Sequence, residues 1–289
     1  MLLTKLKQSI KRNGIRGMLR NLDSRFGIGR VEYIMAINWF NPFATFWLNM
    51  RALPFLQAIR FPIWVYGTPR FYNLSGMIRF NSKVTSGMIK FNIVRSGSPS
   101  LQCLNSEIEN EGQIIFNGPG IIGTGNRIFV ARGGLLEIGS DFKITDMVNI
   151  GVMRHVSIGD MTRITHRCQI MDSNYHYVAN FSKMIIPNRT HYIKIGNYCW
   201  IGNTTTITGG AKITDYTIVC SNSLVNKSIN SKPQNSLIGG IPAKLISSGF
   251  RKVENKTIHN EVNKYFSEND SSIFAINSEI TMDKCSSIS

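Results

Sequence analysis

Residues 195 to 225 read IGNYCWIGNTTTITGGAKITDYTIVCSNSLV, and an aliphatic residue occupies every sixth position of this stretch. The aliphatic positions are Ile195, Ile201, Ile207, Ile213, Val219 and Val225. Four residues after each of the first five stands a small or compact residue: Cys199, Thr205, Ala211, Thr217 and Ser223. Strands alternate with a period of two and helices with a period of about 3.6, so neither element explains this pattern. A six-residue unit cannot bury an apolar face alone, so the repeat predicts short strands stacked into a triangular β-helix.

The same rhythm continues upstream of residue 195, with two interruptions. The step of six holds in two groups: Ile138, Ile144 and Ile150, then Ile158, Ile164 and Ile170. Between the groups it slips by two residues around Val156 and Ser157, which we interpret as a bulge or a widened corner. After Ile170 the rhythm stops until Ile193. Residues 171–192 are therefore predicted to form a loop on one face, and such insertions commonly carry a solenoid's function.

Specific motifs occur in three segments of the repeat region: Ile195–Asn203, Ile218–Ile229 and Ile238–Lys244. Together with the interrupting loop, they resemble the hexapeptide-repeat acyltransferases over roughly residues 134 to 248. Within that family the chain looks most like the acetyltransferases that modify surface polysaccharides and sugars. The resemblance implies a left-handed coil, an exception to the usual right-handed crossover. It also implies a homotrimer, because relatives complete the coenzyme A groove with a neighbouring subunit.

The expected organisation is mainly β, with a left-handed parallel β-helix between two flanking regions. Residues 1–74 are predicted to form a basic and aromatic N-terminal cap, 75–248 the β-helix, and 249–289 a tail. A short helix is expected at residues 256–268 of the tail. The aromatic, proline-punctuated residues 38–66 fit a cover for the open first coil, and also a partner surface or a peripheral membrane patch.

The net charge of +16 calls for an explanation. Lys and Arg residues crowd the segment from Lys5 to Arg30, with apolar residues interleaved. This pattern predicts either a basic amphipathic helix on an anionic membrane surface or a solvated helix on the end of the solenoid. Some positive charge also suits the phosphates of coenzyme A. No nucleic-acid partner is expected, since no recognised binding motif accompanies the charge.

Composition and termini predict a cytoplasmic location, with or without peripheral attachment to the inner membrane face. The five cysteines have no paired metal spacing, and Cys168 and Cys199 fall at the small-residue position of their hexads. We expect reduced packing residues, as in a reducing compartment. No apolar run approaches the ~20 residues of a membrane span, and the start lacks the apolar core of a signal peptide.

The loop predicts the catalytic residues. Transfer of an acetyl group to a sugar hydroxyl needs a base, and a neutral imidazole suits that task. His176 in the stretch Asp172–His176 matches the family's catalytic base, and Asp172 is a candidate to orient it. Asn174 and His191 are candidates for substrate binding, with His191 the second candidate for the base. His155 and His166 lie inside regular hexads, where structural roles are expected.

The resemblance implies acetyl-coenzyme A as the donor and no metal. Trp200 would pack beside the thioester or the acceptor, and backbone amides near Trp200–Asn203 could stabilise the oxyanion. The positions that match the family's donor groove are Trp200, Gly202, Asn203, Ser221, Asn226, Lys227 and Lys244. Lys227 and Lys244 are the candidates for phosphate contacts.

The sequence therefore predicts an acetyl-coenzyme A dependent O-acetyltransferase. Its acceptor would be a cell-surface polysaccharide (capsule, O-antigen or exopolysaccharide) or a precursor sugar, either free or lipid-linked. An N-acyltransferase acting on an amino sugar shares the fold and the donor and stays open as the alternative. A zinc lyase of the γ-type carbonic anhydrase kind is a remote alternative, since it needs three converging imidazoles and the five histidines lack the expected spacing.

Overall fold

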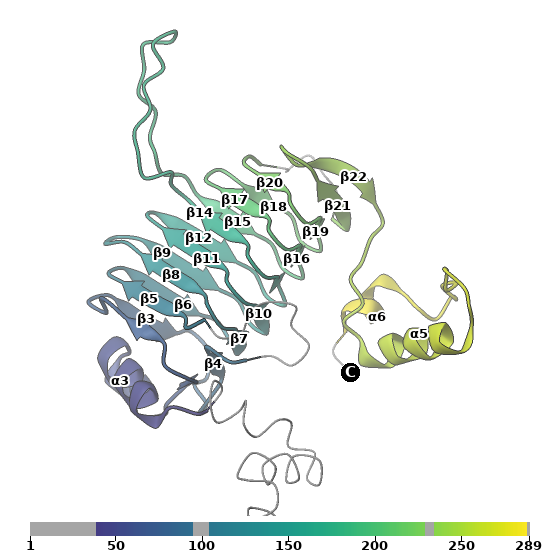
Figure 1. Cartoon of the computed structure of the whole chain (residues 1–289), viewed down its shortest axis with the longest axis horizontal. Helices are drawn as coiled ribbons and strands as arrows, with labels where there is room; N and C mark the ends of the chain where they lie inside the picture. Colours follow the sequence, from purple (N-terminus) through teal and green to yellow (C-terminus); the bar gives the residue numbers. More distant parts are fainter. Residues whose placement is uncertain (1–38, 95–103, 229–233, 288–289) are drawn as a thin grey trace, which may run out of the picture.

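A computed structural model of the chain describes residues 39–94, 104–228 and 234–287. The basic helix predicted within residues 5–30 lies outside the described residues. Parallel strands wind into a three-sided prism (Figure 1). The hexads predict this triangular parallel β-helix, and the family resemblance implies its left-handed coil. Strands that neighbour one another within a face come from successive coils, so the chain visits the other two faces between them.

The three faces are named sheet 1, sheet 2 and sheet 3, in the order in which the chain enters them. Sheet 1 consists of β1 (Ile63–Val65), β4 (Ile89–Phe91), β7 (Gly120–Ile122), β10 (Phe142–Ile144), β13 (Arg163–Ile164), β16 (Trp200–Ile201), β19 (Ile218–Val219), β21 (Ser236–Gly239) and β22 (Lys244–Ser248). Sheet 2 consists of β2 (Arg70–Phe71), β5 (Glu107–Asn110), β8 (Arg127–Val130), β11 (Asn149–Val152), β14 (Gln169–Met171), β17 (Thr206–Thr208) and β20 (Leu224–Val225). Sheet 3 consists of β3 (Met77–Phe80), β6 (Gln113–Phe116), β9 (Leu135–Ile138), β12 (His155–Ile158), β15 (Ile193–Ile195) and β18 (Lys212–Ile213).

The hexad residues stack in register along the axis of the prism. In sheet 1, for example, Ile164 pairs with Ile144 on one side and with Ile201 on the other. Every aliphatic hexad position from Ile138 to Val225 is buried. Since full burial of such a side chain contributes about 1.5–3 kcal/mol, this column is the main source of the fold's stability. The coils also begin earlier than residue 75, because β1 and β2 already pair with the strands of the next coil.

The two-residue slip in the rhythm is a widened corner between β11 and β12. The extra residues, Met153 and Arg154, lie between the end of β11 at Val152 and the start of β12 at His155. Their backbone amides donate to the carboxylate of Asp172, which belongs to the following coil. The buried carboxylate of Asp172 thus satisfies the backbone amides of the two extra residues.

Helix α3 (Pro42–Ala52) closes the open edge of the first coil. Its Asn41 cap accepts the Ala44 amide, and Pro42 takes the first helical position, both common signals for a helix start. The Asn49 side chain exchanges two hydrogen bonds with Ile63 of β1, its Nδ2 donating over 2.7 Å and its Oδ1 accepting over 3.2 Å. A side-chain amide thus replaces the missing neighbouring strand, which would otherwise leave an edge free to pair. The short helix α4 (Phe55–Ala58) follows at the same end.

The C-terminal tail carries two helices beside the prism (Figure 1). Helix α5 spans Lys256–Glu268, the range that the sequence predicts, and starts at the Asn255 cap. Helix α6 spans Met282–Ser286. Among the described residues, none of the helices combines the length and the apolar character needed to cross a bilayer.

An ion pair fastens the tail to the outer face of sheet 1. The Arg163 guanidinium donates to Glu254 over 3.0 and 3.3 Å, and both side chains are largely buried. Arg163 also donates to the backbone carbonyl of Asp141. Lys252 donates to the carboxylate of Glu254. Next to this pair, Arg251 lies 3.6 Å from the ring centroid of Tyr216. Burial raises the pKa of Glu254, but the neighbouring Lys252 and Arg163 outweigh it and hold the pKa below its usual 4.5.

The substitution Glu254→Gln should lower the free energy of unfolding by about 1–3 kcal/mol and release the tail, because it leaves the buried Arg163 without a counterion. In the wild-type protein the folded-state pKa of Glu254 is below the unfolded one, so this stabilisation is present above pH ~4.5 and is lost as the pH falls through the folded value. Urea unfolding and limited proteolysis after residue 250 measure both effects. The matched control is Glu268→Gln in an exposed i,i+4 pair with Lys264. Equal stability of the two variants would contradict the clamp.

Candidate functional site

The predicted loop projects from the prism as a long excursion between β14 and β15 (Figure 1). It leaves the corner between sheets 2 and 3, which we call the loop corner. Two antiparallel bridges hold its arms together, Ser173 with Thr190 and Asn180 with Ile185. At its base, the His191 amide donates to the Asp172 carbonyl over 2.9 Å. The hydrogen-bonded base brings the two ends of the excursion, and hence both loop histidines, to one place.

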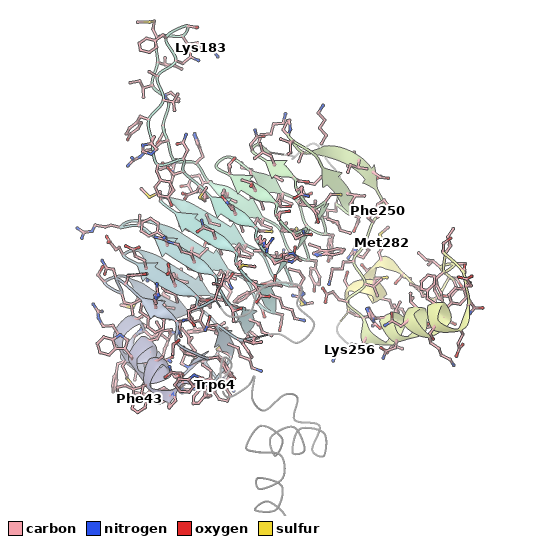
Figure 2. The ribbon with its side chains drawn as sticks, in the orientation of Figure 1. Phe43, Trp64, Lys183, Phe250, Lys256 and Met282 are labelled. Atoms are coloured by element: carbon pink, nitrogen blue, oxygen red, sulfur yellow. The ribbon has the colours of Figure 1, made fainter. Side chains whose placement is uncertain are left out.

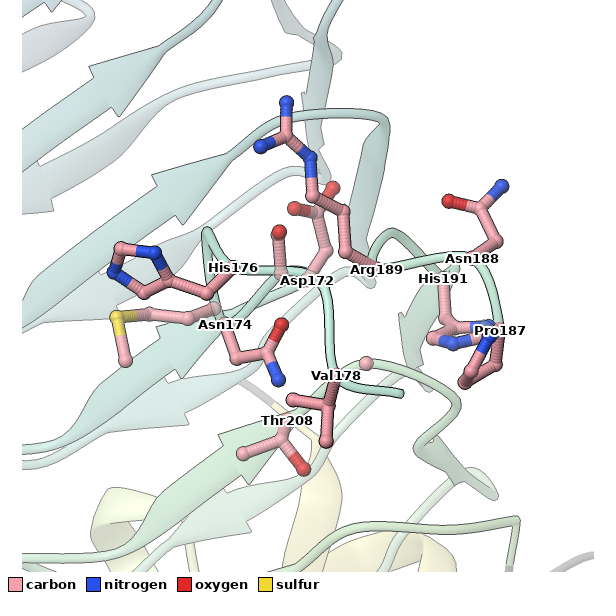
Figure 3. Close-up of a pocket in the computed structure, with 12 residues that line it drawn as sticks. Asp172, Asn174, His176, Val178, Pro187, Asn188, Arg189, His191 and Thr208 are labelled. Carbon is pink, nitrogen blue, oxygen red and sulfur yellow. The ribbon is translucent and has the colours of Figure 1, made fainter. Parts of the chain in front are cut away.

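A cavity of about 400 Å³ lies at the loop base (Figure 3). Its lining includes Asn174, His176, Arg189 and His191, with Thr208 of β17 on the adjacent coil. In Figure 3 the imidazoles of His176 and His191 point to opposite sides, and the Asn174 amide and Val178 lie between them in this view. Both histidines are exposed. The structure thus brings together His176, Asn174 and His191, the loop residues that the sequence singles out.

Tyr175 anchors the start of the loop to sheet 2. Its backbone has φ of 65°, its ring lies 6.4 Å from that of Phe129, and its hydroxyl approaches Gly151 of β11 so closely that a Cβ there would come within 2.5 Å of it. Burial, followed by the negative charge of Asp172, raises the pKa of Tyr175 above its usual 10. Because Tyr175 folds back onto the sheet, the next residue, His176, is held at the mouth of the cavity.

Asp172 serves the backbone rather than an imidazole. Its carboxylate is fully buried and accepts the amides of Met153, Arg154 and His155 over 2.7–2.8 Å. Within the described residues, no hydrogen bond joins it to His176. The predicted orienting contact is therefore absent there, and the carboxylate instead holds the widened corner of the preceding coil against the loop base.

The predicted donor-groove residues are divided between two corners of the prism. Gly202, Asn203 and Ser221 follow strands of sheet 1, at the corner that leads into sheet 2, which we call the groove corner. Here the Ser221 hydroxyl donates to the Asn203 side chain. Trp200 begins β16 beside this corner and is 37% exposed, with the Lys252 ammonium 5.8 Å from its ring centroid.

The remaining predicted residues lie near the C-terminal end of the prism. Asn226 and Lys227 follow β20 at the loop corner, where Ser228 bridges to Lys212 of β18. Lys244 begins β22 opposite Gly239. All three are exposed. Sheet 2 separates the loop corner from the groove corner, so one chain does not bring Trp200, Asn203 and Ser221 to the cavity that His176 lines.

Two residues of the site escape the sequence analysis. Arg189 lines the cavity, donates to the Tyr175 carbonyl over 2.8 Å and places its guanidinium 4.9 Å from the Tyr177 ring centroid. Gly209 packs so closely below the loop base that a Cβ would come within 2.7 Å of the Asp172 carbonyl oxygen and 3.1 Å of the His191 Cβ. The Gly209–Gly210 pair within a hexad was an available signal, since glycine in a strand pattern often marks a close backbone approach.

His155 has the structural place expected of it, within a small polar cluster on sheet 3. Its Nε2 lies 2.7 Å from a Glu137 carboxylate oxygen, and its ring meets that of Tyr192 edge to face at 5.3 Å. In the part of the chain that the structure describes, no three His, Cys, Asp or Glu side chains gather as a set that could bind a metal ion.

Comparison with known proteins identifies one informative relative. The chain is 30% identical over 147 residues to WbbJ of Escherichia coli (strain K12), named as a candidate lipopolysaccharide biosynthesis O-acetyl transferase. The match covers 48% of the chain and 74% of WbbJ. No protein-family model matches the chain.

Solved structures give more distant likenesses. The hexapeptide-repeat acetyltransferase VCA0836 from Vibrio cholerae O1 biovar eltor, complexed with acetyl coenzyme A, is 25% identical, with a TM-score of 0.34 and coverage of 39% of this chain and 60% of that one. A mutant of AntD, an N-acyltransferase from Bacillus cereus complexed with dTDP-4-amino-4,6-dideoxyglucose and coenzyme A, is 13% identical, with a TM-score of 0.40 and coverage of 81% and 100%.

The substitution Asp172→Asn should lower the free energy of unfolding by about 1–3 kcal/mol. Three backbone amides donate to the two carboxylate oxygens of Asp172, whereas an asparagine side chain has only one acceptor oxygen. Urea denaturation measures the loss. Asp215→Asn is the matched control, since that corner carboxylate accepts a single backbone amide, from Asn197, and should lose less. A large drop in turnover with unchanged stability would instead restore the orienting role for Asp172.

Proposed function

Because the chain belongs to the hexapeptide-repeat acyltransferase family, we propose that it is an acetyl-coenzyme A dependent O-acetyltransferase. The acceptor is a cell-surface polysaccharide or a precursor sugar. The likeness to WbbJ supports this choice of acceptor class. The observation that carries the proposal is the cavity at the loop base, which two exposed histidines, His176 and His191, line together with Asn174.

We assign the general base to His176. Its imidazole removes the proton of the sugar hydroxyl while the oxygen attacks the acetyl carbonyl, and returns that proton to the departing thiolate of coenzyme A. His191, on the other arm of the loop, would bind the acceptor together with Asn174. Asp172 is a positioning residue in this scheme, because its buried contacts tie both loop arms to the coil below. Arg189 joins the site as a cation beside the cavity.

The donor would lie along the outer coils near the C-terminal end of the prism. Asn203, Ser221 and Asn226 offer uncharged polar groups there, and Lys227 and Lys244 offer exposed cations for the phosphates. Trp200 and the amides from Gly202 onward are the candidates to meet the thioester and its oxyanion. The scheme uses no metal, and it places the reaction in the cytoplasm, where acetyl-coenzyme A is available.

A homotrimer would complete this site. The loop corner carries His176, and the groove corner carries Trp200, Asn203 and Ser221, on opposite sides of sheet 2. Around a three-fold axis the loop corner of one subunit can face the groove corner of the next, which is the economical closure for such an interface. The separation of the two corners within a single chain is what supports this assembly.

The N-acyltransferase alternative shares the fold, the donor and the base. The chemical stability of the product separates the two reactions. Alkaline hydroxylamine cleaves acetyl esters on oxygen and releases the acetyl group as acetohydroxamate, whereas acetyl groups on nitrogen remain as amides. Incubation of the purified protein with radiolabelled acetyl-coenzyme A and cell polysaccharide, followed by hydroxylamine treatment, therefore tests the proposal directly. Retention of the label after treatment would favour the alternative.

The substitution His176→Ala should lower turnover by about 10²–10⁴, the usual contribution of a general base, and leave coenzyme A affinity nearly unchanged. Steady-state kinetics and calorimetric titration with coenzyme A measure the two quantities. His191→Ala is the matched variant on the opposite arm and should act mainly on the KM of the acceptor. If His191→Ala is the more damaging change in turnover, the base is assigned to the wrong histidine.

Mixed trimers should recover activity that neither parent has. His176→Ala removes the base from the loop corner, and the double substitution Trp200→Ala, Asn203→Ala disables the groove corner. Co-expressed, the two inactive variants should regain measurable acetyl transfer, because some interfaces combine an intact loop corner with an intact groove corner. Sedimentation checks the assembly. Trimeric mixtures without any recovered activity would place the whole site within one subunit, and a stable monomer would contradict the assembly itself.

A further inference from the structure

The N-terminal end of the prism carries an outward apolar face. Helix α3 buries Thr45, Leu48, Asn49 and Ala52 against the first coil. The side chains that point away from the prism on α3, on α4 and directly after α4 are mostly large and apolar. They are Phe43, Phe46, Trp47, Phe55, Leu56 and Ile59, with exposed fractions from 46% to 83%. Apolar side chains placed together on the solvent side of a helix indicate an interaction surface.

A groove of about 720 Å³ deepens this face. Its lining is almost entirely aromatic and apolar: Phe40, Pro42, Phe43, Phe46, Phe61 and Trp64. Phe40 and Trp64, which both line the groove, meet edge to face with their ring centroids 5.6 Å apart. Figure 2 shows Phe43 and Trp64 at this end of the prism, while Lys183 at the tip of the loop points away from it.

The charges around the apolar face have one sign. From residue 33 to residue 106 the sequence contains no Asp or Glu. Arg51 lies on the outer side of α3, and Arg60 follows α4 and donates to the Val84 carbonyl over 3.4 Å, beside Lys83. Within the described residues, no ion pair involves any of these three cations. We call these three cations and the six outward apolar side chains between Phe43 and Ile59 the cap face.

We propose that the cap face docks onto a bilayer containing anionic lipid. Aromatic side chains favour the interfacial depth of a bilayer, and nearby Lys and Arg are attracted to anionic headgroups. A second copy of the chain fits less well, because a two-fold contact would bring like charges together. An acidic protein is the other chemistry that cations could meet, but the apolar groove suits acyl chains and aromatic anchors suit an interface. This inference does not rest on the acetyl transfer proposed above.

Vesicle flotation of the full chain tests the docking. Wild-type protein should float at low salt with phosphatidylcholine vesicles that contain phosphatidylglycerol, and should stay unbound with phosphatidylcholine alone. The double substitution Phe43→Ser, Phe55→Ser should weaken binding by about tenfold or more through the apolar area lost. Arg51→Glu, Arg60→Glu should weaken it similarly through charge. Matched controls in the tail, Ile273→Ser, Ile276→Ser and Lys264→Glu, Lys284→Glu, should bind as the wild type does, and circular dichroism should show all variants folded.

A fluorescence readout separates the cap face from other parts of the chain. Three of the four tryptophans, Trp39, Trp47 and Trp64, lie in this region. Lipids brominated in the acyl chain should quench their emission on vesicle binding, and Trp47→Phe should remove part of the quenching. Unchanged flotation of the Phe43, Phe55 variant would assign binding to residues 1–38 and overturn the proposal. Failure of the wild type to float, or self-association that the same variant abolishes, would overturn it as well.

Discussion

Each coil of this protein depends on an aliphatic side chain that stacks on its equivalent in the coils above and below. Ile150, Ile170 and Ile207 form such a column in sheet 2, in register and without exposure. A two- or three-residue strand has too few hydrogen bonds to hold its place alone, so the columns align the strands that the ladders then join. Segments outside the columns can differ in length and sequence without disturbing the stack. The loop leaves the prism at a corner between two strands, and the cap and the tail lie before and after the coils.

Both ends of such a column have to be closed, and the two closures differ in their chemistry. At the start, the Asn49 side chain supplies a donor and an acceptor to β1, so a helix ends the sheet without another strand. At the other end, β22 turns back and pairs antiparallel with β21. The composition of residues 38–66 predicts that this segment covers the first coil. It does not predict that the buried side-chain amide of Asn49 pairs with β1.

How far the sequence predicts the structure depends on how local each feature is. The hexads predict the strands and the loop because each rule spans six residues. The helix α5 is likewise a local feature, and in the structure the adjacent Asn255 caps its start. Contacts between distant positions are beyond such rules: Arg163 and Glu254 are 91 residues apart. Asp172 shows the same limit, since a carboxylate near a histidine suggests a catalytic pair until the coil stacking shows three backbone amides in reach. The division of the predicted site residues between two corners likewise follows from the winding of the chain.

Because the base of the loop is closed by hydrogen bonds, the stability of the coils does not depend on the length of the loop. The His191 amide donates to the Asp172 carbonyl across the base, and Ser173 bridges to Thr190 beside it. Residues between Tyr175 and Arg189 are mostly exposed and add little to the columns. Insertions, deletions and exchanges in the outer arms are thus nearly neutral for folding, since longer closed loops cost little extra entropy. Sequence changes in this segment can therefore reshape the cavity, which Val178, Pro187 and Asn188 also line, without altering the hexads of the coils.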